Sequence, residues 1–389
     1  MKRIGIYGGT FNPPHLGHFR VVQSAFSALQ LDKLYVVPAF QAPNKQGEVV
    51  AEPEHRLQML QLCFGGEPRI TVSDCELQRG GISYTVDTVQ QLKQEHPDAE
   101  FILLLGTDSF LSFDSWHQWE QILQSASLAV FARGDKNEQA AIAEKTLQLA
   151  DYGARIYRVE HPVTTLSSTD VRRMLTLRCA DDYLHPKVAA YIQWKGLYDT
   201  QRNMRHLPVE KLENAVVSLL KPNRVQHVLG CRDAAVQLAR HWGENETNAE
   251  RAALLHDITK ALDGSLQLTL CHAYGIVLDD FSLKYPKTIH ALTGSLVAQR
   301  IFGEDEAVVS AIRWHTTGKA NMNLLEKIIY VADYMENNRK FPGVEELRRL
   351  AFEDLDAALK LGLEMTLALL REQGSEISPD TQNALQWLK

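Results

Sequence analysis

The chain has 389 residues, 45% hydrophobic and 23% charged, which is an ordinary globular composition and long enough for two or three domains. Its formal net charge of −7 argues against a broad nucleic-acid surface, which needs clustered Lys and Arg. No run reaches the roughly 18 apolar residues of a membrane helix, and Gly5 and Gly8 interrupt the N-terminus too early for a secretory signal.

The five cysteines are scattered and form no C-x-x-C pair, which fits a reducing compartment and no disulfide framework. We therefore expect a soluble, cytoplasmic protein without nucleic-acid or membrane partners. The sequence leaves open whether it forms a homo-oligomer.

Residues 1–198 alternate between short apolar runs and amphipathic stretches. The runs predict buried strands at 4–7, 34–37, 70–72, 101–105, 128–131 and 156–159. The stretches between them predict helices at 18–30, 53–63, 85–95, 116–125 and 137–149. This alternation indicates an α/β domain with a Rossmann-like, doubly wound parallel sheet, in which ligands bind at the carboxyl ends of the strands.

The polar segment 199–208 ends in Pro208 and is the predicted linker between two domains. After it, residues 209–389 consist almost entirely of segments with the apolar spacing of amphipathic helices. We therefore predict an all-α second domain.

The first strand leads directly into Gly8-Gly9-Thr10-Phe11-Asn12-Pro13-Pro14-His15-Leu16-Gly17-His18. Glycines at this point allow backbone N–H groups to approach a phosphate. Residues three apart share one face of a helix, and a helix start adds N–H donors and a partial positive charge. His15 and His18 therefore predict an anion-binding site, whereas a bare H-x-x-H could equally be coincidental.

A second motif, Leu166-Ser167-Ser168-Thr169-Asp170-Val171-Arg172, places hydroxyls and an arginine at another predicted helix start. Together the two motifs resemble the signatures of nucleotidyltransferases. The resemblance implies Mg²⁺-dependent binding of ATP by Gly8, Gly9, Thr10, Phe11, His15, His18, Ser167, Ser168, Thr169 and Arg172. It also implies that His15, His18 and Arg172 are catalytic, with His18 at the α-phosphate.

Three further segments, Ser83–Thr88, Gly106–Phe110 and Ser115–Trp119, resemble those of nicotinate-mononucleotide adenylyltransferases, although that family usually has alanine where Thr107 stands. The resemblance implies transfer of AMP from ATP to nicotinate mononucleotide, giving deamido-NAD and pyrophosphate. The residues that it implies for nicotinate mononucleotide are Lys45, Thr85, Asp108, Trp116 and Arg133. The alternative is a pantetheine-phosphate adenylyltransferase, which would need neither Ser83–Thr88 nor Trp116.

In the second half, His256 and Asp257 stand at the end of an apolar helical run. Burying these two polar side chains is costly unless they bind something. With His227, His290, His315 and Asp333 they resemble the HD phosphohydrolase superfamily, in the version that holds two metals. Imidazole and carboxylate ligands suit Fe, Mn or Zn rather than Mg²⁺ alone. We expect one metal at His227, His256, Asp257 and Asp333, and another at His290, His315 and Asp257.

Two divalent metals bridged by Asp257 would activate water and hold phosphate oxygens. The segments Leu255–Lys260, His315–Gly318 and Ala332–Val344 resemble bacterial HD-domain hydrolases that cleave diadenosine tetraphosphate symmetrically, although Val225 replaces the usual tyrosine. The resemblance implies this substrate, Fe²⁺ or Mn²⁺ as cofactor, and polyphosphate contacts from Lys260 and Arg339. Alternatives are an HD phosphohydrolase of another nucleotide or a regulatory module without turnover.

Overall fold

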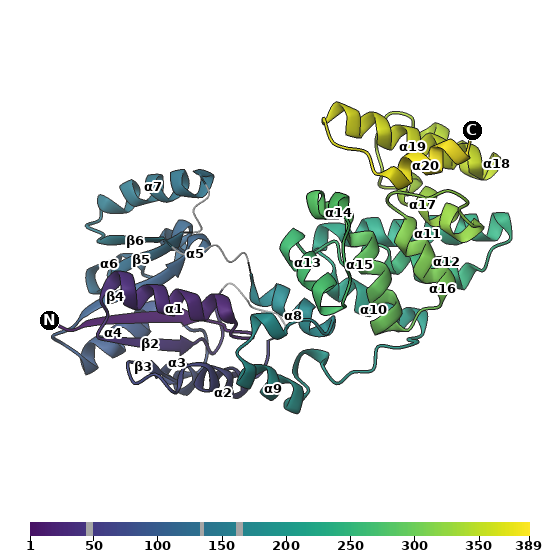
Figure 1. Ribbon diagram of the computed structural model, residues 1–389. Helices are drawn as coiled ribbons and strands as arrows, with labels where there is room; N and C mark the ends of the chain where they lie inside the picture. The colour runs from purple at the N-terminus through teal and green to yellow at the C-terminus, as the bar shows by residue number, and fades with distance from the viewer. Residues whose placement is uncertain (44–49, 133–135, 161–165) are drawn as a thin grey trace. The chain divides into compact units, whose positions relative to one another are not determined.

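The computed structural model describes residues 1–43, 50–132, 136–160 and 166–389 (Figure 1). It divides into two compact units, Met1–Arg202 and Asn203–Lys389. The boundary between the units falls inside the segment 199–208 that the sequence suggests as a linker. Whether each half folds alone remains a prediction.

The first unit contains one six-stranded sheet in the order β3-β2-β1-β4-β5-β6, and every neighbouring pair is parallel. Its strands are β1 Arg3–Gly9, β2 Lys33–Pro38, β3 Ile70–Val72, β4 Glu100–Gly106, β5 Ser127–Ala132 and β6 Ile156–Glu160. This confirms the predicted doubly wound sheet. The strand order reverses between β1 and β4, so a ligand is expected to bind beyond Gly9 and Gly106, where these strands end.

Helices cover both faces of this sheet because successive strand residues point to opposite sides. On one face, Ile4, Ile6 and Leu103 pack with residues of α4, α6 and α7. On the other, Leu34 and Ile102 pack with residues of α1 and α2. The helical segments of this unit are α1 Leu16–Leu29, α2 Pro53–Phe64, α3 Cys75–Arg79, α4 Thr85–Glu95, α5 Thr107–Leu111, η2 Phe113–Ser115, α6 Trp119–Ser125, α7 Lys136–Ala150, α8 Ser168–Thr176, η3 Asp181–Tyr183, α9 Pro186–Lys195 and η4 Leu197–Asp199.

The helix predicted at 116–125 is wrong at its start. Trp116 has extended backbone angles and Gln118 is left-handed with φ of 52°, so α6 begins only at Trp119. The short helices α3 and α5 were not predicted, because five residues give too little periodicity to recognise.

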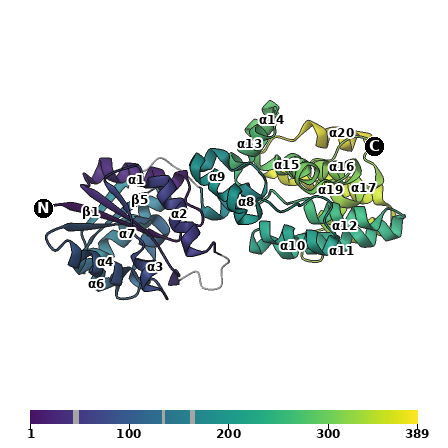
Figure 2. The same cartoon turned by 90° about the horizontal axis from the view of Figure 1, so that it is seen from below.

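The second unit is helical, and its described residues contain no strand, which confirms the all-α prediction. Helix α11 packs against α12 and α17, and α16 packs against α12, α15 and α17 (Figure 2). The helical segments are α10 Val209–Leu219, α11 Pro222–Trp242, α12 Glu246–Leu255, α13 Gly264–Ala273, α14 Asp280–Lys284, η5 Pro286–Thr288, α15 His290–Val297, η6 Ala298–Phe302, α16 Glu306–Trp314, α17 Leu324–Met335, α18 Val344–Glu353, α19 Leu355–Glu372 and α20 Pro379–Trp387. Throughout the described chain, no helix has the length and apolar character needed to cross a membrane.

Candidate functional sites

The two histidines of the first motif form the start of α1. The Nδ1 atom of His15 accepts a hydrogen bond from the Gly17 N–H at 3.1 Å, and the Nδ1 atom of His18 accepts one from the His15 N–H at 3.1 Å. Each neutral ring therefore carries its proton on Nε2, where it can be donated to an anion. Burial is the main cause that holds the pKa of His15 well below its usual range. His15 is thus a neutral donor.

Gly17 is needed for this geometry, because a Cβ there would lie 2.9 Å from the His15 ring. Gly8 and Gly9 end β1, as the motif requires. The Phe11 ring is buried and its centroid lies 5.0 Å from that of His18. Any contact of Phe11 with ATP would therefore come from its backbone.

Arg56 of α2 holds the loop that carries this motif. Arg56 is only 1% exposed, and its guanidinium donates to the carbonyl oxygens of Thr10 at 2.9 Å and Ala39 at 2.6 Å. It also donates to the carbonyls of Ala51 at 2.9 Å and Phe40 at 3.1 Å. Its role was not foreseen from the sequence, because it depends on chain segments that meet only in the folded unit.

The second motif lies directly against the first. Ser167 caps α8 and forms a capping box with Asp170. The Ser168 hydroxyl donates to the Pro13 carbonyl at 3.0 Å. Arg172 donates to the Asn12 carbonyl at 2.7 Å and to the Thr169 hydroxyl at 3.1 Å. The structure therefore brings together two motifs separated by about 150 residues, as a shared phosphate site requires.

The candidates for nicotinate mononucleotide lie on segments that follow the strands. Thr85 is the first residue of α4, and Asp108 is exposed in the first turn of α5, just after β4. Trp116 is half-buried against Phe113, with ring centroids 5.5 Å apart. The rings of Tyr84 and His117, 4.3 Å apart, connect the start of α4 to the Trp116 segment. Lys45 and Arg133 lie outside the described residues.

Thr107, where the family usually has alanine, is buried at the start of α5. Its hydroxyl donates to a carboxylate oxygen of Glu138 in α7. The extra hydroxyl therefore has a partner between two helices of the same unit.

In the second unit, the six predicted metal ligands come together from five helical segments. His227 lies in α11 and Asp333 in α17, while His290 is the first residue of α15. His256 and Asp257 follow the end of α12, and His315 follows the end of α16.

The two oxygens of Asp257 face different histidines. Its Oδ2 atom lies 3.7 Å from the Nε2 atom of His227 and 3.5 Å from that of His256. Its Oδ1 atom lies 3.3 Å from Nε2 of His290 and 3.7 Å from Nε2 of His315. On the first side, Asp333 Oδ1 lies 3.1 Å from Nε2 of His227. Two groups of donor atoms are close enough to share an ion, one of His227, Cys231, His256 and Asp333 and one of His256, Asp257 and His315. The division into two metal sites that the sequence suggests stays a prediction.

Hydrogen bonds at Nδ1 orient three of these histidine rings so that Nε2 faces the other predicted ligands. His256 Nδ1 lies 2.7 Å from the Ala253 carbonyl oxygen, and His315 Nδ1 lies 2.7 Å from the Ile312 carbonyl oxygen. His227 Nδ1 lies 3.2 Å from Glu336 Oε1. Such outer partners fix the tautomer and leave Nε2 for a metal. Glu336 was not recognised from the sequence, although it follows Asp333 by one helical turn.

Two buried polar atoms test whether this cluster fits a metal. Within the described part of the chain, His256 Nε2 and Asp257 Oδ1 make no hydrogen bond, although both residues are only 1% exposed. Such atoms are costly to bury without a partner. Burial alone would raise the pKa of the Asp257 and Asp333 carboxyls, but neighbouring histidines hold the pKa of both well below its usual range. These donors fit a divalent cation.

Three basic side chains line the same cluster. Lys260 Nζ lies 2.8 Å from His290 Nε2, and Arg339 donates to Asp333 Oδ1 at 2.6 Å. Arg224, which was not singled out as a site residue, donates to Asp257 Oδ2 through Nε at 2.7 Å. The predicted polyphosphate contacts Lys260 and Arg339 therefore lie beside the predicted metal ligands.

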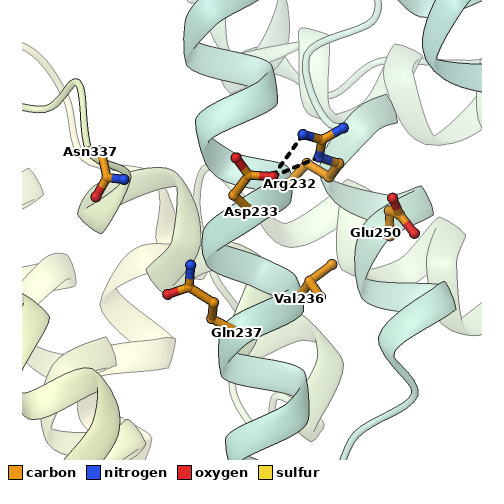
Figure 3. Close-up of a pocket in the computed structure, with 6 residues that line it drawn as sticks. All are labelled: Arg232, Asp233, Val236, Gln237, Glu250 and Asn337. Atoms are coloured by element: carbon orange, nitrogen blue, oxygen red, sulfur yellow. Dashed lines mark hydrogen bonds and ion pairs between the residues drawn. The ribbon is translucent and has the colours of Figure 1, made fainter.

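A separate pocket of about 350 Å³ lies beside α11 (Figure 3). Its arginine, Arg232, already pairs with Asp233 at 2.7 Å and with Glu213. None of the predicted site residues lines it, so we assign it no part in either site. The lining residues are Arg232, Asp233, Val236, Gln237, Glu250 and Asn337.

Comparison with known proteins identifies a class for each half. A cytidylyltransferase-like family model matches residues 6–174, and an HD domain model matches residues 224–338. The chain thus combines a nucleotidyltransferase domain with an HD domain.

The relatives define the first half more closely. A probable nicotinate-nucleotide adenylyltransferase of Albidiferax ferrireducens is 42% identical over 202 residues, which span 100% of that protein and 51% of this chain. One of Bordetella petrii is 39% identical over 199 residues, again 100% of that protein and 51% of this chain. The chain therefore belongs to the nicotinate-nucleotide adenylyltransferase family.

Among solved structures, a predicted HD superfamily hydrolase involved in NAD metabolism from Clostridium acetobutylicum is similar to this chain at 38% identity. The match covers 47% of this chain and 97% of that one, with a TM-score of 0.46.

Proposed function

We propose that the N-terminal unit transfers AMP from ATP to nicotinate mononucleotide. The observation that carries this proposal is the pair of neutral histidines at the start of α1, against which the Ser168 and Arg172 motif is packed. Family membership supports the choice of nicotinate mononucleotide over the pantetheine-phosphate alternative.

In this reaction a phosphate oxygen of nicotinate mononucleotide forms a bond to the α-phosphorus of ATP. The bond between that phosphorus and the oxygen leading to the β-phosphate breaks, and pyrophosphate leaves. The protein supplies positioning and charge stabilisation rather than a nucleophile. His18 donates from Nε2 to the α-phosphate, while His15, Arg172 and the N–H groups at the start of α8 hold the triphosphate. A Mg²⁺ ion bound to ATP would neutralise further phosphate charge.

Recognition of the base is assigned to Trp116 and Thr85. The indole ring stacks on the nicotinate ring, and the start of α4 donates to its carboxylate. We therefore expect rapid turnover with nicotinate mononucleotide and weak turnover with its amide. Measuring deamido-NAD and NAD formation with ATP and each substrate tests this, and equal rates would contradict it.

The HD domain we assign to hydrolysis of diadenosine tetraphosphate into two ADP. Its support is the cluster around Asp257, where two buried polar atoms make no hydrogen bond to any described residue and Lys260 and Arg339 lie at the edge. His227, His256, Asp257 and Asp333 would hold one divalent cation, and His290, His315 and Asp257 a second. The cations, Fe²⁺ or Mn²⁺, would supply Lewis acidity toward water and phosphate. The basic side chains neutralise the remaining phosphate charge and orient the chain of phosphates.

Symmetric cleavage requires attack on a phosphorus beside the central bridging oxygen. ADP then leaves, and the hydrated half is also ADP. The test incubates the purified full chain with diadenosine tetraphosphate and Mn²⁺ or Fe²⁺ and separates the products by chromatography. ADP alone supports the proposal, whereas ATP with AMP would mean asymmetric cleavage. Failure to cleave it, with turnover of a deoxynucleotide, a guanosine alarmone or a cyclic dinucleotide, would favour another HD phosphohydrolase.

A further inference from the structure

A buried cysteine lies inside the cluster of proposed metal ligands. Cys231 follows His227 by one turn of α11, so both side chains leave the same face of that helix. Its Sγ atom lies 3.6 Å from Nε2 of His227 and 3.9 Å from Oδ1 of Asp333. The possible donor atoms of His227, Cys231, His256 and Asp333 all lie within 4.8 Å of one another.

We propose that Cys231 is a thiolate ligand of the metal ion held by His227, His256 and Asp333. This inference rests on the metal site of the proposed function, and it adds a ligand that the H…HD…H…H…D pattern does not contain. The thiol loses its proton on binding, and no oxidation or reduction takes place.

The spacing of the donor atoms fits a shared ion. At a tetrahedral angle, ligands at about 2.0–2.3 Å from one ion are separated from each other by roughly 3.3–3.7 Å, and an ion that Asp257 also binds would have ligand angles on either side of that value. The separation of 3.6 Å between Cys231 Sγ and His227 Nε2 falls within this range. The 3.9 Å between Sγ and Asp333 Oδ1 exceeds it by only a few tenths of an ångström.

A second, independent observation also points to an ion at this position. His256 Nε2 is buried, its ring is oriented by the Ala253 carbonyl, and it has no hydrogen-bond partner among the described residues. It belongs to the same group of four as Cys231. A metal bound there would satisfy the imidazole nitrogen and the sulfur together.

A thiolate would change which metals the cluster selects. Sulfur ligands favour Zn²⁺, Fe²⁺ and Co²⁺ over Mg²⁺ and Mn²⁺, which prefer oxygen. Of the two proposed ions, the one beside Cys231 is therefore expected to be the more selective, whereas the one at His290 and His315 has only nitrogen and oxygen ligands.

Cobalt substitution tests this inference without measuring activity. The full chain is stripped of metal, loaded with Co²⁺, and examined for bound cobalt and for its absorption spectrum. We expect visible d–d bands together with a near-ultraviolet band from sulfur-to-cobalt charge transfer. Cys231→Val should lose the charge-transfer band and keep bound cobalt. Cys271→Val, a buried cysteine of α13, is the matched control and should retain both signals.

The outcomes separate the two hypotheses. Bound cobalt without a charge-transfer band in the unmodified protein, or a band that persists in Cys231→Val, would overturn the inference and leave the proposed metal site standing. No bound cobalt at all would overturn both. If the Cys231→Val protein does not fold, alkylation of the unmodified chain gives a second measurement. Zn²⁺ should protect Cys231 much more strongly than Cys271, and equal protection would contradict the inference.

Discussion

The two candidate sites use histidine in opposite ways. In the first unit, the Nδ1 atoms of His15 and His18 already accept backbone N–H groups at a helix start, so the rings are fixed before any ligand arrives. In the second, His256 and Asp257 are buried with an unsatisfied atom each, as far as the described residues extend. The rings of the first site are oriented by the protein's own backbone, whereas the second site holds buried atoms that an ion would satisfy.

The difference also has an energetic side. An unsatisfied buried donor or acceptor costs about 1–3 kcal/mol. Without metal, the free energy of unfolding of the second unit should therefore be lowered by this cost, and cation binding should raise it again. Cations are not expected to stabilise the first unit in this way, so the effect of metal on unfolding distinguishes the two units.

The largest effect is expected from Asp257→Ala. It removes the carboxylate that faces four histidines, so bound metal and phosphohydrolase activity should be lost. Removing one partner of a buried pair costs about 3–5 kcal/mol, and we expect the lower end because Arg224 is 30% exposed. Metal analysis, product chromatography and denaturant unfolding measure these changes. Adenylyl transfer should be unchanged, as should both activities in the control Asp233→Ala. Full hydrolysis by Asp257→Ala would exclude the cluster as the active site.

The second prediction, His18→Ala, concerns adenylyl transfer by the first unit. Loss of a donor aimed at developing phosphate charge costs about 10²–10³-fold in kcat. The lost cap should cost only about 1 kcal/mol of stability. His185→Ala is the matched control, because His185 also accepts a backbone N–H at a helix start, that of α9, but lies outside the motif. Equal losses of kcat in the two variants would show that capping, not phosphate contact, explains the effect.

A smaller effect is expected from Gly230→Ala. A Cβ at this position would clash with Oε2 of Glu336, so the carboxylate that contacts Nδ1 of His227 would have to shift. Loss of such an outer partner typically lowers metal affinity about 10–100-fold. Titration of the metal-free protein with Zn²⁺ measures the change. Glu336→Gln, which keeps the shape but removes the charge, should give a weaker effect in the same direction. Unchanged Zn²⁺ affinity in both variants would show that Glu336 does not contribute to metal binding.

The smallest effect is expected from separating the halves. If each unit carries its own core, fragments 1–202 and 203–389 should unfold with free energies within about 0.5 kcal/mol of those in the full chain. Each should also retain its own activity. Cutting after Tyr198 instead would remove Thr200, whose hydroxyl donates to the Leu197 carbonyl at 2.9 Å. Failure of either fragment to unfold cooperatively would contradict two independent domains.

Sequence patterns were informative where the relevant contacts are local. The strands, the glycine-rich loop and the helix that follows it depend on neighbouring residues, and the order of histidines and aspartates predicted residues that the fold brings together. Patterns failed where the backbone departs from periodicity, as at Trp116 and Gln118. They also failed where a role depends on distant segments. Cys231 could have been noticed from its spacing to His227, but Arg56 could not, because its four carbonyl partners lie in two segments, one between β1 and α1 and one between β2 and α2.

Arg56 also affects how mutational screens of this protein would be interpreted. No lysine can replace it, because a single ammonium cannot reach carbonyls on several sides as a planar guanidinium does. A screen that ranks positions by lost activity would place Arg56 beside His15 and His18, although its hydrogen bonds to the described residues go to the protein's own backbone. Sensitivity to substitution at this position would therefore report the shape of the loop and not contact with a nucleotide.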